Sequence, residues 1–181
     1  MTIRHPHSFF QTTEESKFSE GKIRYAFINA FNAQNQAQID SLTREMQAID
    51  SINEMEICDI LDTRGFVGRD QVGDASNVFW MVIQHAPLEL EKKYFPKFVE
   101  AMKRGDIPKS NIVLMDDRIA MFEGRPQRYG TQFVEKDQGK WALYDLLDPE
   151  KVDQWRQEMD LGPLADELKC MGVDSGRKPA D

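Results

Sequence analysis

The chain has 181 residues, of which 40% are hydrophobic and 30% are charged, and its formal net charge is −8. This length suits one ordinary domain with a real core, and the composition is that of a globular protein in water. The negative charge argues against nucleic acid or an anionic membrane as partner, because both need a basic face, whereas a local arginine still allows a small polar or anionic molecule to bind.

The N-terminal segment, residues 1–16, predicts a flexible arm, because it is polar and lacks the apolar core of a signal peptide. Its His5 and His7 have a spacing that metal ligands can have, but a loose terminus explains them better. No apolar run approaches the roughly 18 residues of a membrane span. Cys58 and Cys170 stand far apart, without the spacing of metal ligands, and are expected as free thiols. A cytoplasmic protein is therefore predicted.

The first half of the chain predicts amphipathic helices. A helical pattern of apolar residues begins at Phe18. Apolar residues in steps of three and four then mark one helix face from Ile39 to Ile60, which Gly65 ends. Asn53 lies on this apolar face, and a buried polar group costs stability unless it is hydrogen-bonded. Asn53 is therefore expected either to tie two helices together or to belong to a site.

A glycine-rich stretch, residues 64–77, predicts a loop before a helix that is apolar almost all round and that Pro87 ends. Asn77 and Gln84 share one face of this helix. His85 comes last before the break, where the negative end of the helix dipole raises the pKa of a histidine. His85 is thus a candidate for catalysis or for capping the helix.

The second half predicts three further helices and a hairpin. Residues 88–105 form an amphipathic pattern that Pro96 is expected to kink or divide. The next helix begins at Pro108 or Ser110 and ends before Gly124. Two short strands around residues 137–139 and a final helix over about 149–172 follow.

The fold class predicted from these patterns is mainly α. We expect a single compact helical domain over residues 17–172, with one small β-hairpin near residues 131–144. Residues 173–181 are expected to form a polar tail.

Three consecutive charges, Asp116, Asp117 and Arg118, interrupt the apolar helix pattern of residues 112–122. Asp117 and Arg118 each have apolar neighbours one turn before and after them, so an unpaired charge there would be very unfavourable. Adjacent residues on a helix do not face each other. Both side chains are therefore expected to find partners in other parts of the fold.

Three short motifs occur in a fixed order: Gln-His-Ala at 84–86, Asp-Arg at 117–118 and Gly-x-Pro-x-x-Tyr-Gly-Thr-Gln at 124–132. With these motifs the chain resembles an uncharacterised, mostly bacterial family that carries only a domain-of-unknown-function number. The resemblance runs from about residue 49 to about residue 168. Family members usually have an acid after Gln-His-Ala, where this chain has Pro87. The resemblance implies no established activity, so function rests on the residues.

The motif residues together suit acid–base chemistry on a small molecule. His85 would act as base or acid, Asp117 would hold its tautomer and Tyr129 would be a second proton donor. Arg118 would bind a carboxylate or phosphate. The substrate would receive neutral hydrogen bonds from Gln84, Thr131, Gln132, Asn77 and Asn53. The sequence thus predicts an enzyme that hydrolyses, cyclises or isomerises a polar, for instance amino-acid-like, substrate.

Two alternatives to an enzyme stay open. The same cluster could be a buried polar network that fixes the helix register, or the chain could be a ligand- or protein-binding module. Covalent catalysis is disfavoured because Ser76 and Ser110 lack a nucleophile elbow. A metal site is disfavoured because His85 has too few further donors at a suitable spacing. Neither a metal nor another cofactor is expected.

Overall fold

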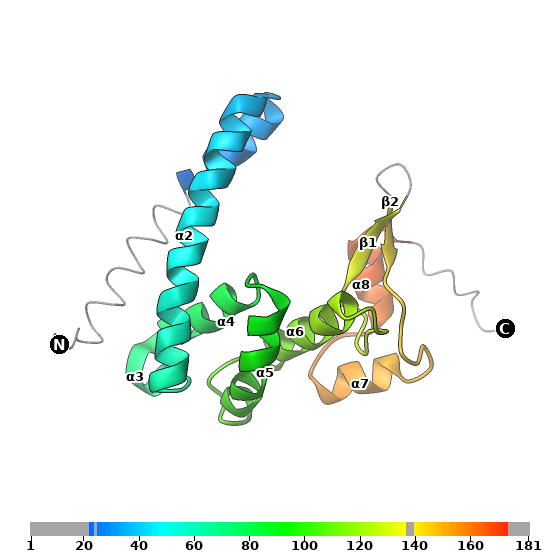
Figure 1. The fold of residues 1–181 in the computed structure, drawn as a ribbon. Helices are drawn as coiled ribbons and strands as arrows, with labels where there is room; N and C mark the ends of the chain where they lie inside the picture. Colours follow the sequence, from blue (N-terminus) through cyan, green and yellow to red (C-terminus); the bar gives the residue numbers. More distant parts are fainter. Residues whose placement is uncertain (1–21, 24, 137–139, 174–181) are drawn as a thin grey trace. The chain divides into compact units, whose positions relative to one another are not determined.

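The computed structural model describes residues 22–136 and 140–173, with the exception of residue 24. The segments predicted as an arm, 1–16, and as most of a tail, 174–181, lie outside the described residues, as does the turn at 137–139. Contacts divide the chain into two units, Met1–Val82 and Ile83–Asp181. Figure 1 labels their helices and strands.

The described residues are mainly helical with one small antiparallel sheet, which confirms the predicted fold class. The order of elements is α2 (Gln36–Thr63), α3 (Arg69–Val72), a 3-10 turn (Gly73–Ser76), α4 (Asn77–Ile83), α5 (Leu88–Lys103), α6 (Lys109–Phe122), β1 (Phe133–Lys136), β2 (Lys140–Leu143), α7 (Val152–Glu158) and α8 (Leu164–Cys170). No helix among the described residues is long and apolar enough to cross a bilayer.

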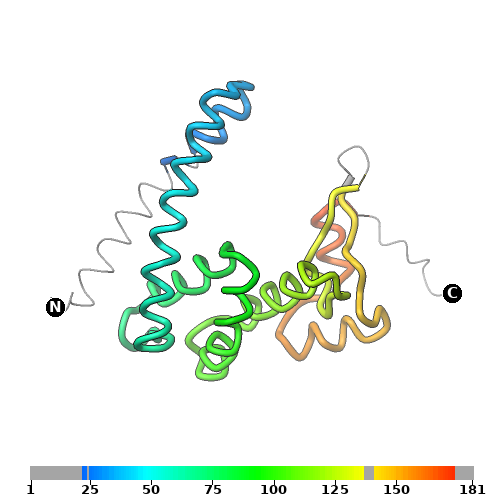
Figure 2. The backbone as a smooth tube through the Cα atoms, in the orientation of Figure 1, coloured from blue at the N-terminus to red at the C-terminus, as the bar shows by residue number. Residues whose placement is uncertain are grey.

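The first unit is dominated by the long helix α2, which the tube in Figure 2 follows without a break. Asn35 caps its start, because the side-chain oxygen accepts a hydrogen bond from the backbone N–H of Gln38 at 3.2 Å. Only the C-terminal end of α2 is fully buried, at Ile57 and Leu61, so the core of this unit lies at that end. Asn53, on the predicted apolar face, is half-buried.

The glycine-rich segment after α2 was predicted as a loop, and this is wrong. It contains α3 and the 3-10 turn, short pieces that the loop composition did not reveal. Phe66, just before α3, packs against Phe79 of α4, with 5.3 Å between the ring centroids. Tertiary packing of this kind stabilises short helices that propensity alone does not form.

The second unit is built on α5 and α6, which pack against each other. Pro96 was expected to kink or divide the helix, but α5 is one helix over its whole length. The ring of Pro96 is exposed, while the row Glu91, Tyr94, Phe98 and Ala101 is buried on the other side. Burial of that row outweighs the roughly 3 kcal/mol that an interior proline costs a helix.

The predicted hairpin is confirmed. Strands β1 and β2 pair antiparallel, with Phe133 opposite Leu143. The hairpin covers a small apolar cluster, in which the buried Val152, Leu164 and Leu168 are joined by partly buried residues of the hairpin and its flanks.

The final helix, predicted as one element over about 149–172, is in fact two, α7 and α8. Pro163 precedes α8, and the residue before a proline disfavours the helical conformation. Asp160 adopts a left-handed φ of 58° in the intervening turn. This turn brings the backbone of Gly162 back towards α7, where its carbonyl oxygen accepts a hydrogen bond from Arg156.

Candidate functional site

The three consecutive charges of α6 point in different directions, because successive residues of a helix are about 100° apart. Asp116 is half-buried, Asp117 is fully buried and Arg118 is half-buried. Asp117 and Arg118 both find partners elsewhere in the second unit, as expected from the sequence.

Asp117 holds the backbone of the loop that follows α6. Its Oδ1 accepts hydrogen bonds from the N–H groups of Arg128, at 2.8 Å, and Tyr129, at 2.9 Å. Its Oδ2 accepts from the N–H of Thr131, at 3.0 Å, and from the hydroxyl of the same residue, at 2.9 Å. These bonds use about all four lone-pair positions of a carboxylate. Asp117 therefore clamps the loop, and the predicted role of holding the tautomer of His85 stays a prediction.

The close turn of this loop depends on Gly130. Its φ is +75°, in the left-handed region, and an added Cβ would lie 2.7 Å from Cδ1 of the buried Leu164. We expect Gly130→Ala to lower the free energy of unfolding by about 1–3 kcal/mol, from backbone strain and crowding together. Urea unfolding followed by circular dichroism measures this loss.

Gly124→Ala is the matched control for that experiment. Gly124 has a similar φ of +71°, but an added Cβ would meet nothing within 4 Å. The difference between the two variants isolates the contact with Leu164. Equal losses for both variants would show that the close approach of loop and α8 is not important.

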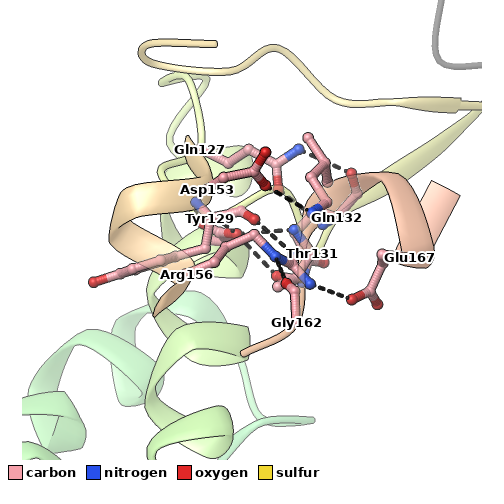
Figure 3. A network of polar contacts seen from close by, with 10 residues as sticks. Gln127, Tyr129, Thr131, Gln132, Asp153, Arg156, Gly162 and Glu167 are labelled. Atoms are coloured by element: carbon pink, nitrogen blue, oxygen red, sulfur yellow. Dashed lines mark hydrogen bonds and ion pairs between the residues drawn. The ribbon is translucent and has the colours of Figure 1, made fainter. Parts of the chain in front are cut away.

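The loop is also held by the buried side chain of Gln127 (Figure 3). Its Nε2 donates to the carbonyl oxygens of Gln132, at 3.0 Å, and Tyr144, at 2.9 Å. Its Oε1 accepts from the N–H of Gln132 at 2.8 Å. Gln127 thus ties the two ends of the loop to each other and to the segment that follows β2.

Arg156 of α7 binds the loop from the opposite side and is 2% exposed (Figure 3). Its guanidinium donates to the carbonyl oxygen of Tyr129 at 2.8 Å, to that of Gly162 at 2.6 Å and to Oε2 of Glu167 at 2.8 Å. The peptide groups of Tyr129 are therefore bound by two buried charges, Asp117 at the N–H and Arg156 at the carbonyl.

Arg128 of the same loop lies near two aromatic side chains, and Asp116 of α6 lies near Arg128. The guanidinium of Arg128 lies over two aromatic rings, 5.6 Å from the centroid of Tyr129 and 4.7 Å from that of Trp155. Within the described part of the chain, neither this guanidinium nor the carboxylate of Asp116 makes a hydrogen bond. These four residues form the outer cluster, in which Arg128 is exposed, Asp116 and Trp155 are half-buried and Tyr129 is buried.

The pKa values within the outer cluster are shifted. Burial raises the pKa of the Asp116 carboxyl, and the negative charge of Asp117 adds to this, while Arg128 and Arg125 oppose it. Burial also raises the pKa of Tyr129; Arg128 opposes this shift and Asp116 adds to it. Asp116, Arg128 and Tyr129 are thus close enough to act on one another electrically.

A second polar pair lies between α5 and α6. Nε of Arg118 donates to Oε1 of Glu91 at 3.1 Å; the two side chains are 30% and 1% exposed. The other oxygen of Glu91, Oε2, is buried and has no hydrogen-bond partner among the described residues. Burial raises the pKa of Glu91, although the charge of Arg118 opposes this.

The other predicted site residues are dispersed. Gln132 lies with the Asp117 clamp, its Nε2 3.2 Å from Oγ1 of Thr131. Gln84 and His85 lie in the turn after α4, half-buried and exposed respectively. Asn53 and Asn77 belong to the first unit, and their part in a site stays a prediction.

Possible metal ligands do not gather in the described part of the chain: no three histidine, cysteine or acidic residues there could hold one ion. Cys58 is half-buried and Cys170 is exposed, and neither forms a disulfide within the described part of the chain.

The model of a family of unknown function, DUF6624, matches residues 19–178 of the chain. The chain belongs to this family. Searches of curated proteins and of solved structures found no match. The DUF6624 region includes the whole second unit up to residue 178, so it contains the Asp117 clamp, the outer cluster and the Glu91–Arg118 pair. The family's description names no activity, and the function has to be argued from this geometry.

Proposed function

We propose that the chain is an enzyme that carries out acid–base chemistry on a small polar anion at the outer cluster. Asp116 and Tyr129 would transfer protons, and Arg128 would bind the negative charge. The observation that supports this most directly is Asp116, a half-buried carboxylate with no hydrogen bond to any described residue. Asp117 next to it is fully buried and is bound within the protein, whereas the carboxylate of Asp116 remains able to bind solvent or a ligand.

The environment of Asp116 suits a general base or acid. An ordinary aspartate is a weak base, because it holds a proton only in acid solution. Burial and the neighbouring charge of Asp117 raise the pKa of Asp116 and so move it towards the working pH of an enzyme.

Tyr129 and Arg128 complement this base. The raised pKa of Tyr129 keeps its phenol protonated, so that it can donate a hydrogen bond to negative charge that develops on a substrate. Contact with the rings of Tyr129 and Trp155 restricts the guanidinium of Arg128, and its donors remain available for a carboxylate or phosphate.

The Asp117 clamp and Arg156 would fix this geometry. They bind the N–H and the carbonyl of Tyr129, the residue that carries the proposed proton donor. A reacting group that is held before the substrate arrives loses little freedom during the reaction. The buried network and the proposed chemistry are therefore compatible, because the network holds the proposed proton donor in position.

Asp116→Asn is expected to lower turnover about 100-fold or more, because general acid–base catalysis contributes about 10²–10⁴-fold. Proton NMR of the protein with a panel of amino acids and small carboxylic acids would identify the consumed substrate and give its rate. In the unmodified protein the rate should rise with pH as Asp116 loses its proton, and the variant should lack this dependence. Tyr129→Phe should also lower the rate, with folding unchanged.

Glu135→Gln is the control, since Glu135 is an exposed carboxylate on β1 outside the cluster. If Asp116→Asn consumes the substrate as fast as this control does, Asp116 is not the proton-transfer group.

A binding module is the second candidate, because Asp117, Gln127 and Arg156 are all satisfied within the protein, as structural groups are. In that case a small anion from the panel binds, Arg128→Gln weakens its binding, and no compound is consumed.

A further inference from the structure

Three residues form a row along α6, and none of them belongs to the outer cluster. Leu114, Arg118 and Phe122 follow one another at four-residue spacing, which places them on one face of the helix. Leu114 is 36% exposed and Phe122 is 53% exposed, and both are large apolar residues. Arg118 thus stands between two exposed apolar side chains.

The guanidinium of Arg118 is held in place on two sides. Its Nε donates to Glu91, and its central carbon lies 5.1 Å from the ring centroid of Phe122. Its two Nη groups make no hydrogen bond to any residue that the structure describes. These two groups form the edge of the guanidinium that binds a carboxylate with two parallel hydrogen bonds.

Glu91 positions Arg118 but offsets its charge only in part. One oxygen of Glu91 has no hydrogen-bond partner among the described residues, and burial raises the pKa of Glu91 while Arg118 opposes this. The nearby Lys92 is paired with Glu123, at 2.8 Å, and Glu123 is also paired with Arg125. Glu89, on the same helix as Lys92, attracts it electrostatically. These four charges, two positive and two negative, offset one another, so an added anion would be bound by the hydrogen-bond donors of Arg118 and not by a local excess of positive charge.

We propose that this row binds a monocarboxylate that has an apolar chain or ring. The carboxylate would accept hydrogen bonds from the Nη groups of Arg118, and the apolar part would cover Leu114 and Phe122. Charge selects an anion over an amine, and the two exposed apolar side chains select a longer chain over a short one. This inference does not depend on the proposed function.

Hexanoate is expected to bind at least about tenfold more tightly than acetate, because each methylene that becomes buried strengthens binding about fourfold. Titration of the ¹⁵N-labelled full-length protein, observed in amide and arginine Nε–H NMR signals, measures both affinities. Hexylamine, which has a similar chain and the opposite charge, should not bind this row.

Variants distinguish the contribution of the guanidinium from that of the apolar side chains. Arg118→Gln should abolish the binding of both carboxylates, and Leu114→Ala should weaken hexanoate several-fold with little effect on acetate. Glu91→Gln should strengthen binding, since it removes a competing negative charge and keeps an oxygen for Nε. Arg104→Gln, at an exposed arginine paired with Asp106, is the control.

The proposal fails if hexanoate binds no more tightly than acetate, or if Arg118→Gln binds hexanoate as the control does. If Arg118→Gln does not fold, Leu114→Ala provides the test. Equal losses of affinity for hexanoate and acetate in this variant would overturn the proposed position of the hydrocarbon chain.

Discussion

Replacing Asp117 with alanine is expected to lower the free energy of unfolding by about 3–5 kcal/mol. The substitution removes the acceptor of three backbone N–H groups, those of Arg128, Tyr129 and Thr131. It also removes the partner of the Thr131 hydroxyl. Buried donors without an acceptor cost about 1–3 kcal/mol each, and partial hydration of a loosened loop reduces the sum. Urea unfolding followed by circular dichroism and tryptophan fluorescence measures the loss.

Asp116→Ala is the matched control for this prediction. It removes the neighbouring aspartate from the same helix, and Asp116 has no hydrogen bond to a described residue to lose. Its effect should stay within about 1 kcal/mol. If the two variants lose equal stability, Asp117 does not clamp the loop.

Periodicity made most of the helices of the second unit predictable. The spacing of apolar residues predicted α6, and the turn residues predicted the hairpin. Because unpaired buried charges are unfavourable, distant partners were correctly expected for Asp117 and Arg118. The failures were local interruptions. One final helix was expected, but Gly162 and Pro163 lie between two helices, α7 and α8. The helical pattern on both sides of these residues led to the prediction of a single helix.

The identity of the partners could not be read from the pattern. Asp117 binds backbone N–H groups, and every residue except proline has one, so no sequence signal points to positions 128–131 as its partners. The predicted meeting of His85 with Asp117 rested on chemical suitability alone. Chemical suitability does not determine which way a helix face turns within a fold.

Two of the missed residues did carry a signal. Glu91 lies on the buried row of α5 with Tyr94 and Phe98, at steps of three and four, so its burial followed from spacing. Arg156 lies four residues after the buried Val152 on α7. Neither residue was predicted to be buried, although its position on the helix indicates burial.

Replacing Arg156 with methionine is expected to lower the free energy of unfolding by about 3 kcal/mol, because one partner is removed from a buried charged network. Methionine keeps most of the apolar stem but leaves the carbonyl oxygens of Tyr129 and Gly162 without a donor. Glu167, whose side chain is 38% exposed, can return to water, which limits the loss. Arg156→Lys keeps the charge, yet an ammonium does not reach three acceptors in the directions of a guanidinium, so it should recover only part of the stability.

The double variant Asp117→Ala, Arg156→Met tests whether both charges stabilise the same element. They bind opposite sides of one residue, the N–H and the carbonyl of Tyr129. Once either charge is removed the loop is already loosened, so the second substitution should cost at least about 1 kcal/mol less than it does alone. Urea unfolding of the four proteins gives this coupling energy. Strictly additive losses would mean that Asp117 and Arg156 stabilise separate parts of the second unit, and the loop that carries Tyr129 would then not be held from two sides.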